Sequence, residues 1–419
     1  MRSAYSSGIP LAFERIVFNL VILSNEFSVL PTQSQHVSVG TIVAGLKHAA
    51  GKQGILLMRL AKRFIIGMLL QLCRIARTIS SFFPSRTVLW FTSWAGSVVG
   101  KFCSREEKIS IAQIRYAFPE GLPERVLAAN KSEWSSRPDF REFDTHGDKA
   151  EVSVEEYRAL ANRVFRHVGE SVGELLLWKR FLRHRESILK RGVETGQRQE
   201  KIISEGADII EDLRRSGVGA VGLSGHLGSF ELLAAYLAEC GLKCSVIGRS
   251  PNYPLLEKVI REFRQAFGVE IIWSDAADAP RQMVRAVRSG RVICALIDQD
   301  TKWKSDFSPF FGLEAASPAG PIQLAMRYEL PIFTSFIVRT SPMSHLVTTE
   351  TVPYCATDPE AKSKILRIYN DRLENLIRLH PEQYIWWHRR WRRRPGVDYG
   401  HSPQLLRNAS QYREWLEGA

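Results

Sequence analysis

His226 and Glu231 are the two side chains whose types and spacing best suit acid–base chemistry in this chain of 419 residues. A neutral imidazole, whose pKa is ordinarily roughly 6.5, can take the proton of an attacking hydroxyl. A carboxylate beside it fixes the tautomer and stabilises the imidazolium that forms. Such a pair could activate an alcohol toward an acyl group without a serine or cysteine nucleophile. The alternative interpretation is a hydrogen-bonded or helix-capping histidine beside a solvated glutamate.

The residues around this pair predict a strand, a loop and a helix. Residues 219–224 are apolar and compatible with a strand, whereas apolar residues recur at helical spacing over 230–240. With His226 in the loop and Glu231 in the first helical turn, the two side chains can converge, and the positive helix end favours the carboxylate. Gly225 and Gly228 would let a substrate backbone or thioester approach closely.

Two later loops, each directly after an apolar stretch, supply candidate binding residues. Arg249 and Asn252 follow the first of them, and the guanidinium could hold a phosphate or carboxylate, unless it is simply exposed at a turn. Asp298 and Asp300 follow the second, flanking Gln299, and we expect them to orient the Arg249 loop or a polar head group. No histidine or third carboxylate stands near them at ligand spacing, so we expect neither a metal nor another cofactor.

Aromatic residues in the last third of the chain have two interpretations. Phe307, Phe310 and Phe311, framed by prolines, could line an acyl-chain slot or pack in the core. Tryptophan and arginine alternate over 386–394, which suits an anionic membrane surface and would also suit nucleic acid. Within this run, Arg389 and Arg390 are candidate substrate-binding residues.

The basic charge of the chain is concentrated in two regions. The net charge is +13, yet residues 27–105 hold ten Lys or Arg and no acid, and five arginines lie between 389 and 394. The rest of the chain is slightly acidic, so this distribution favours docking on an anionic surface through these regions over nonspecific electrostatic binding by the whole protein. The six cysteines are scattered without a CxxC pair, which indicates reduced thiols on the cytoplasmic side.

The acid-free region is also apolar, and it predicts contact with a membrane. Its longest uncharged run, 64–73, is shorter than the roughly 20 residues that cross a bilayer, so an interfacial helix is the preferred interpretation. A helical hairpin packed on the enzyme and a tilted spanning helix remain alternatives. Residues 88–99, rich in Trp, Phe and Val, belong to the same region.

The organisation that we expect is an α/β fold, in which a mixed sheet is flanked by helices after an N-terminal, basic and apolar membrane-binding helical segment. Helices are predicted at 105–118 and 153–179, and short apolar runs alternate with helices from residue 219 onward. There is no internal repeat, no GxGxxG fingerprint and no Walker loop, which argues against a nucleotide enzyme. The predicted parts are a poorly defined extension (1–50), the membrane-associating segment (51–105), a catalytic domain (106–396) with a polar insertion (121–152), and a tail (397–419).

Taken together, the motifs resemble the bacterial lipid A biosynthesis acyltransferases, part of the wider lysophospholipid acyltransferase superfamily. They are found in the family's order over about residues 54–396, and they comprise Gly225-His226 to Glu231, Arg249 with Asn252 and Pro254, Asp298-Gln299-Asp300, Phe310-Phe311-Gly312, and Trp387-His388-Arg389-Arg390-Trp391 with Pro395. The insertion and the first fifty residues depart from the family's pattern, so the resemblance does not specify the acceptor.

The resemblance implies a lysophospholipid-acyltransferase-like fold and an enzyme of lipid A and lipopolysaccharide biosynthesis at the cytoplasmic face of the bacterial inner membrane. Such an enzyme moves a fatty acyl group from acyl carrier protein or coenzyme A to a hydroxyl of a glycolipid. His226 would be the general base, Glu231 its orienting partner, and Arg249 the holder of an anionic acceptor. Acylation of another glycolipid or lysophospholipid is the alternative. A non-enzymatic lipid- or nucleic-acid-binding protein is the alternative of another class, although no nucleic-acid partner is expected.

Overall fold

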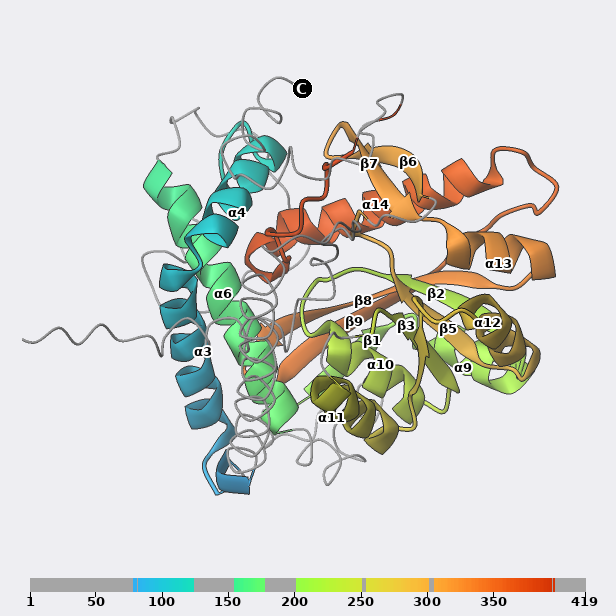
Figure 1. The fold of residues 1–419 in the computed structure, drawn as a ribbon, viewed down its shortest axis with the longest axis horizontal. Coiled ribbons are helices and arrows are strands. Elements are labelled where there is room, and N and C mark those ends of the chain that lie inside the picture. The colour runs from blue at the N-terminus through green and yellow to red at the C-terminus, as the bar shows by residue number, and fades with distance from the viewer. Residues whose placement is uncertain are drawn as a thin grey trace, which may run out of the picture.

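The computed structural model describes residues 78–80, 82–123, 154–177, 201–250, 254–300, 305–393 and 395. The predicted extension 1–50, the apolar run 64–73, nearly all of the polar insertion and the tail 397–419 lie outside the described residues. The described residues form a sheet with helices on both faces, and a group of N-terminal helices lies beside it (Figure 1).

The main sheet has seven strands in the order β1-β9-β8-β2-β5-β3-β4. Strands β8, β2, β5, β3 and β4 are parallel, whereas β9 runs antiparallel to β8 and pairs in parallel with β1. The predicted mixed α/β sheet is therefore confirmed. The strand bounds are β1 Lys201–Glu205, β2 Ala220–Ser224, β3 Cys244–Gly248, β4 Glu270–Trp273, β5 Val292–Leu296, β8 Ile332–Ser341 and β9 Ser344–Thr351.

The parallel strands read as continuous apolar runs because helices cover both faces of the sheet. All five residues of β2 are buried. One hydrophobic cluster joins the sheet to α10, and the other joins it to α12, α13 and α14, so two cores lie on opposite sides of the strands. The helices that follow the strands are α9 Ala207–Ser216, α10 Phe230–Glu239, α11 Pro254–Ala266, α12 Ala279–Arg288, α13 Gly320–Tyr328 and α14 Ala361–Leu379.

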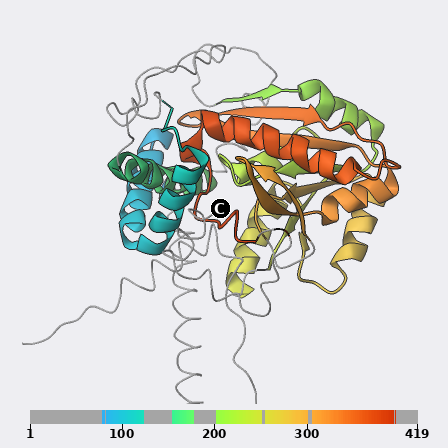
Figure 2. The same ribbon diagram turned by 90° about the horizontal axis from the view of Figure 1, so that it is seen from above.

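Three helices pack beside the sheet, as both views show (Figure 2): α3 Ser85–Phe102, α4 Ser104–Ala117 and α6 Val154–Leu176. Glycines let α3 and α6 approach closely, since a Cβ at Gly96 would lie 2.3 Å from the Phe165 carbonyl and one at Gly169 would lie 2.1 Å from the Thr92 carbonyl. The two helices predicted at 105–118 and 153–179 are thus confirmed in α4 and α6.

The opposite side of α3 is exposed and aromatic. Trp90, Phe91 and Trp94 are 66%, 56% and 52% exposed, although the buried side of the same helix packs on α6. Among the described helices, none combines the length and the apolar character that a membrane crossing demands.

A two-stranded hairpin and the chain end complete the fold. Strands β6 Ser305–Phe310 and β7 Leu313–Pro318 pair antiparallel, and the 3₁₀ helix η1 Pro381–Gln383 follows α14. Phe310 and Phe311 are buried in the core, so core packing, the second of the two interpretations above, is the correct one for them. Phe310 faces the indole of Trp391, with ring centroids 5.7 Å apart.

The prediction of an exposed tryptophan and arginine surface near the chain end is wrong for the described residues. Trp386, Trp387 and Trp391 are buried among other aromatic rings. Arg390 is 1% exposed, and its guanidinium donates to the Ala316 carbonyl, the Ser317 hydroxyl and the Asn370 side chain. The indole rings are therefore unavailable to a membrane or to nucleic acid, and Arg390 fastens the β6–β7 hairpin and α14 to the chain end.

Candidate active site

The loop between β2 and α10 carries His226, as predicted. It pairs with the segment after η1, since the Gly228 N–H donates to the Gln383 carbonyl (2.9 Å) and the Ile385 N–H donates to the His226 carbonyl (3.2 Å). Leu227 and Tyr384 form an isolated antiparallel bridge between these hydrogen bonds. The backbone beside the imidazole is thus held on both sides by residues from the far end of the chain.

Asp298 is the carboxylate that contacts the His226 ring. Its Oδ1 lies 2.7 Å from His226 Nδ1, and its Oδ2 accepts the His226 backbone N–H at 2.8 Å. Asp298 follows β5, the neighbour of β2, and is 1% exposed. Burial raises the pKa of this carboxyl, but attraction to His226 and two hydrogen bonds from it outweigh burial and lower the pKa to about 2. The carboxylate is therefore ionised at neutral pH and holds a proton on Nδ1.

Glu231 lies in the first turn of α10, as predicted, but its carboxylate faces α11. Arg264 donates to both of its oxygens, from Nη2 at 2.6 Å and from Nε at 3.1 Å. The predicted contact between Glu231 and the imidazole is therefore replaced by two others. The Arg264 guanidinium binds Glu231, and the Asp298 carboxylate contacts His226. A bidentate pair with a guanidinium is a strong charge-assisted interaction, which accounts for the direction of the Glu231 side chain.

Gln299 and His388 complete the surroundings of the imidazole. The Gln299 side-chain nitrogen lies 2.9 Å from His226 Nε2 and 2.7 Å from His388 Nε2. Burial and the neighbouring His226 lower the pKa of His388 to about 3, despite the opposite effect of Asp298, so His388 is neutral. Both residues lie within the motifs that carry the family resemblance, but neither was predicted as a site residue. That membership, and the position of Gln299 next to Asp298 at a strand end, were the signals that could have identified them.

The two glycines of the loop face the protein itself. Gly228 has a φ of 61°, and a Cβ there would lie 1.9 Å from the Ile337 carbonyl of β8. At Gly225 a Cβ would meet the side chains of Leu373 and Tyr369 at 3.2 to 3.3 Å. The presence of glycine at these two positions is therefore explained by the close approach of α14 and β8, without a need to make room for a substrate.

The remaining predicted residues are spread along the edge of the sheet. Asp300 accepts from Arg393 (2.7 Å) and from Arg392 (3.4 Å), so it pairs with the chain end. Arg249 directly follows β3, where its charge helps to lower the pKa of Asp275. Arg389 is half-buried between His388 and Arg390, and Asn252 lies outside the described residues. Within the described chain, no three His, Cys, Asp or Glu side chains are grouped to hold a metal ion.

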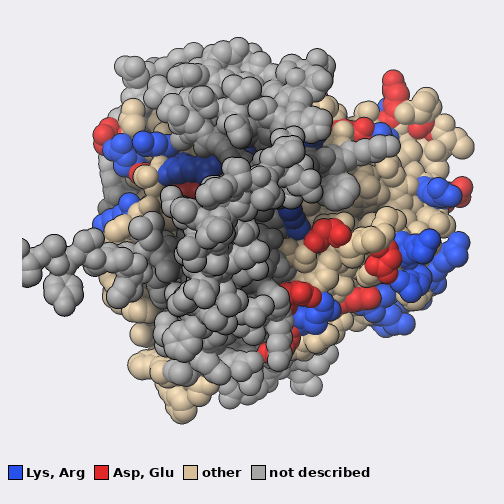
Figure 3. All heavy atoms as spheres, in the orientation of Figure 1, with Lys and Arg blue, Asp and Glu red and all other residues tan. Residues whose placement is uncertain are grey.

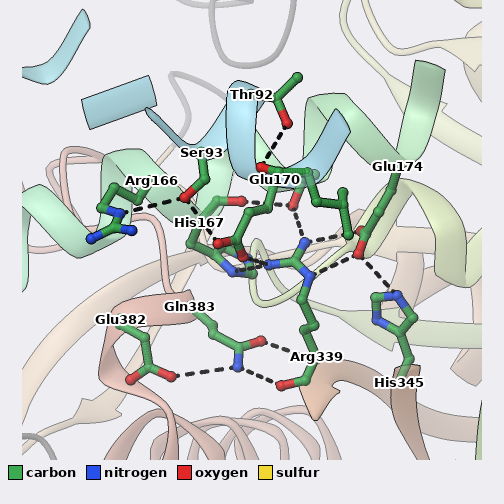
Figure 4. A network of polar contacts seen from close by, with 12 residues as sticks. Thr92, Ser93, Arg166, His167, Glu170, Glu174, Arg339, His345, Glu382 and Gln383 are labelled. Atoms are coloured by element: carbon green, nitrogen blue, oxygen red, sulfur yellow. Dashed lines mark hydrogen bonds and ion pairs between the residues drawn. The ribbon is translucent and has the colours of Figure 1, made fainter. Parts of the chain in front are cut away.

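A network of buried charges braces the His226 loop from the side of α6 (Figure 4). Arg339 of β8 donates to Glu174 (2.7 Å), Glu170 (2.7 Å) and His167 Nδ1 (2.6 Å). Burial and the Arg339 charge lower the pKa of His167 to about 3, so this ring accepts the hydrogen bond as a neutral imidazole. The Gln383 side chain brackets the Arg339 backbone with two hydrogen bonds of 2.8 and 2.9 Å. The network thus reaches Gly228 through the Gln383 carbonyl.

A narrow apolar pocket lies between α10 and the sheet, and Phe230, whose ring contacts that of His226, is one of its lining residues. Phe230 stands at the boundary, its ring edge toward the imidazole with centroids 4.9 Å apart. The Ser224 hydroxyl is buried without a hydrogen-bond partner in the described structure. The pocket is lined by Gly222, Leu223, Ser224, Phe230, Glu231, Leu233, Ala234, Leu237, Val246, Arg264, Cys294, Ala295, Leu296, Phe333 and Ser335.

The described surface shows no uniform basic face in the view of Figure 3. Lys and Arg are interspersed with Asp and Glu there, and they gather over α9 and α12 at the edge of the molecule. The arginines of α12, Arg281, Arg285 and Arg288, are exposed, whereas Asp300 pairs with Arg392 and Arg393, and Arg390 is buried. These three arginines near the chain end therefore interact with the protein itself.

Comparison with known proteins agrees with the family resemblance of the motifs. The family model described as bacterial lipid A biosynthesis acyltransferase matches residues 151–393, more than half of the chain. Lipid A biosynthesis acyltransferase 2 of Shigella flexneri is 27% identical over 197 residues, which cover 45% of this chain and 60% of the relative. Lipid A biosynthesis palmitoleoyltransferase of Escherichia coli is 28% identical over 196 residues, which cover 46% of this chain and 61% of the relative.

A relative with another printed acceptor also matches. Phosphatidylinositol mannoside acyltransferase of Mycobacterium tuberculosis is 25% identical over 132 residues, which cover 31% of this chain and 42% of the relative. The chain thus spans about three fifths, or less, of the length of these curated relatives. The matched residues include the β2–α10 loop, Asp298 and the segment around His388. On the family model's match, the chain belongs to the bacterial lipid A biosynthesis acyltransferase family.

Proposed function

We propose that the protein is an O-acyltransferase that moves a fatty acyl group from a thioester to a hydroxyl of a glycolipid, with His226 as general base. The observation that carries the proposal is the 2.7 Å contact between His226 Nδ1 and the buried Asp298 carboxylate. This contact leaves Nε2 as the basic nitrogen of a neutral ring, which is the arrangement that activates an attacking hydroxyl. Asp298 replaces Glu231 in this proposal as the orienting partner.

The proposed reaction uses the two imidazole nitrogens differently. Nε2 takes the proton of the acceptor hydroxyl while its oxygen attacks the thioester carbonyl carbon. The tetrahedral intermediate then collapses, the carbon–sulfur bond breaks, and the imidazolium returns the proton to the leaving thiolate. Asp298 stays ionised throughout, because its pKa of about 2 is far below neutral pH. The ion pair between ring and carboxylate stabilises the charged intermediate state.

The apolar pocket supports an acyl chain as the transferred group. Its wall is formed by aliphatic and aromatic side chains of α10 and the sheet, and it begins beside the imidazole at Phe230. A buried hydroxyl without a partner costs stability, so the Ser224 side chain at this end suits a donor to the thioester carbonyl. The proposed donor is an acyl thioester of acyl carrier protein or of coenzyme A. Both donors would present the same acyl chain to this pocket.

The exposed aromatic side of α3 supports work at a membrane surface. Indole rings are favoured at the boundary between headgroups and acyl chains, where Trp90 and Trp94 would lie, and Arg86 and Lys101 on the same helix add positive charge. We propose the cytoplasmic face of a bacterial inner membrane as the location, with an anionic membrane as partner.

The acceptor that we favour is a lipid A precursor, following the printed names of the relatives with the longest matches. A mannosylated phosphoinositide or another glycolipid is the second candidate, because the relative from Mycobacterium tuberculosis bears that name. A non-enzymatic lipid- or nucleic-acid-binding protein is less well supported, since its main argument, the tryptophan and arginine cluster, is largely buried.

Acyl transfer to a defined acceptor tests the proposal. The full chain in detergent is given radiolabelled acyl-acyl carrier protein or acyl-coenzyme A with a lipid A precursor or a phosphatidylinositol mannoside that carries a free hydroxyl. We expect acylated product with one acceptor, and a loss of about 10²-fold or more in His226→Ala with an unchanged melting temperature. Full activity in that variant, or thioester binding without transfer, would disprove the general-base mechanism.

A further inference from the structure

Gln113 joins the N-terminal helices to the segment that carries His388. It lies on α4, is 1% exposed, and its amide contacts three backbone groups of residues 386–390. Its Nε2 donates to the carbonyls of Trp386 and His388, the latter at 2.7 Å, and its Oε1 accepts the Arg390 N–H at 2.9 Å. Both hydrogens and the oxygen of the amide are therefore engaged by one short stretch of the chain.

These hydrogen bonds matter because residues 386–390 form turns. Buried backbone groups outside regular secondary structure need partners from elsewhere in the fold, and Gln113 supplies three of them. Aromatic rings fix the same segment: Trp387 stacks on Phe165 of α6 with centroids 4.7 Å apart, and Trp391 contacts Tyr116 of α4 with centroids 5.0 Å apart. Two helices that lie beside the sheet thus determine where this segment lies.

The ring of His388 packs on the imidazole of His226. The centroids of these two rings are 5.1 Å apart, and the Phe230 ring contacts the same imidazole with centroids 4.9 Å apart. Burial and the neighbouring His226 lower the pKa of His388 to about 3, so its ring adds no charge to the site and contributes by its position. A displacement of the His388 backbone would therefore move a ring that contacts the proposed base.

We propose that Gln113 is a positioning residue of the active site, which fixes the His388 backbone and, through the His388 ring, the place of the His226 imidazole. Gln113 lies outside residues 151–393, the range of the family model's match. The inference rests on the proposed function for its effect on acyl transfer, whereas the arrangement of the rings is a property of the protein without substrate. Reaction rates depend steeply on such geometry, since a misplacement of about 1 Å can cost about 10²-fold.

Gln113→Met tests the effect on catalysis, because it keeps the length of the side chain and removes its three hydrogen bonds. We expect kcat to fall by about 10²-fold, as for a misplaced base. The KM values of thioester and acceptor should change little, because Gln113 is not among the residues that line the described pocket. Initial rates are measured at a temperature at which every variant is folded.

Tyr354→Phe is the matched control for lost stability. The Tyr354 hydroxyl contacts the carbonyls of Ala325 (3.1 Å) and Leu330 (2.8 Å), so its removal also deprives two carbonyls of a partner, in a part of the fold without a proposed site residue. Both variants should lower the melting temperature by a few degrees. Only Gln113→Met should lower kcat, and an unchanged kcat in Gln113→Met would overturn the inference.

Gln113→Glu is the conservative variant. Burial against two carbonyl oxygens favours a protonated carboxyl, which can accept the Arg390 N–H and donate to one of the two carbonyls. We expect its kcat to lie between those of the unmodified protein and Gln113→Met, and equal kcat values in the two Gln113 variants would overturn the role of the hydrogen bonds. If Gln113→Met does not fold, Gln113→Glu takes its place in the comparison with Tyr354→Phe, and its kcat should be the lower of the two.

The ring positions are tested without substrate. NMR of the full chain in detergent, with ¹³C,¹⁵N-histidine and at one pH, records the ring signals of His226 and His388, which are assigned by their absence from His226→Gln and His388→Gln. The folded Gln113 variant should shift both signals, and Tyr354→Phe should shift neither. Unshifted signals in the Gln113 variant would overturn the positioning. Shifted signals without acyl transfer by any of the proteins would support the positioning and count against the proposed function alone.

Discussion

The Nδ1 atom of His226 and the Oδ1 atom of Asp298 lie 2.7 Å apart, although 72 residues separate them in the chain. The contact exists because β2 and β5 are neighbours in the sheet, with Ser224 opposite Leu296. Each side chain follows its strand by two residues, so both project from the same edge. Parallel strands collect their C-terminal loops at one edge, which is where open α/β sheets bind ligands.

Asp298→Asn should lower kcat by about 10²–10⁴-fold while the protein stays folded. An amide can still accept from the His226 backbone, but it no longer stabilises the imidazolium. Initial rates with saturating thioester and acceptor measure the effect. Asp278→Asn, at a half-exposed carboxylate on the surface, is the control and should keep full activity. A loss of less than tenfold in Asp298→Asn would contradict the proposed orienting role.

Glu231 and Arg264 should behave as a structural pair. Their side chains are 27% and 12% exposed, so removal of either partner leaves a partly buried charge, and we expect Glu231→Ala to lower the free energy of unfolding by about 1–3 kcal/mol. Exchange of the charges in Glu231→Arg with Arg264→Glu should recover part of this loss. Urea denaturation measures the stability.

Activity distinguishes Glu231 from Asp298 as the partner of the imidazole. Glu231→Gln should leave kcat nearly unchanged, whereas Asp298→Asn should lower it as above, because only Asp298 contacts the His226 ring. Equal losses of kcat in the two variants would show that Glu231 also acts on the ring.

Gly228→Ala should disrupt the loop that carries His226. The added methyl group would lie 1.9 Å from the Ile337 carbonyl, at a φ of 61°, and we expect a cost of at least about 3 kcal/mol together with loss of activity. Gly217 has nearly the same φ, 62°, but open space around it, so Gly217→Ala isolates the backbone cost of roughly 1–2 kcal/mol. Equal melting temperatures for the two variants would contradict the close approach of β8.

The free energy of unfolding should fall as the pH decreases from about 6.5 toward 3, and His167 should account for part of this pH dependence. The pKa of this ring is about 3 in the folded protein, below the ordinary 6.5, so the unfolded chain binds a proton across this window that the folded one does not. The stabilisation is complete above 6.5 and is lost as the pH approaches the folded pKa. The slope contributed by one such ring is about 1.4 kcal/mol per pH unit.

His167→Gln keeps an acceptor for Arg339 and removes the titrating group. The groups that face His167 include Arg339, Glu174 and Glu382, and their charges remain in this variant. Denaturation midpoints between pH 4 and 7 should therefore vary less steeply than in the unmodified protein. If the denaturation midpoints of the two proteins changed equally with pH, a group other than His167 would be responsible for the pH dependence.

Ala234→Phe should shorten the acyl chain that the enzyme prefers. Ala234 lines the pocket from α10, and a phenyl ring there would occupy space that the end of a long chain needs. We expect kcat/KM for the longest accepted thioester to fall by about tenfold or more, with little change for short ones. Ala277→Phe adds the same ring at an exposed loop position and serves as control. Uniform loss over all chain lengths would argue against the pocket as the acyl site.

Local sequence patterns were sufficient to predict the strand, loop and helix around His226. The apolar run of β2 and the helical spacing of α10 are local signals, and they place the histidine in a loop and Glu231 in the first helical turn, as the structure has them. The carboxylate that contacts the ring could not be chosen in this way. Glu231 is near in sequence, whereas Asp298 is brought near only by the order of the strands, which one sequence without an alignment does not specify.

The chain end shows a second limit of sequence reasoning. Arginine and tryptophan are chemically suited both to an exposed anionic surface and to a buried site with enough acceptors, and composition does not separate the two. Arg390 can be buried because the Ala316 carbonyl, Ser317 and Asn370 accept from its two terminal nitrogens, and these partners come from β7 and α14. Its environment is therefore a property of the complete fold.

The pairing of the His226 loop with residues 383–385 also determines when the site can form during synthesis. A ribosome releases β2, α10 and β5 well before it reaches η1, so the sheet can assemble while the loop still has no partner on that side. The imidazole acquires its final surroundings only after His388 has emerged, when nearly the whole chain has been made. A chain that ends before residue 383 lacks the segment that pairs with this loop, so we expect it to lack the proposed activity as well.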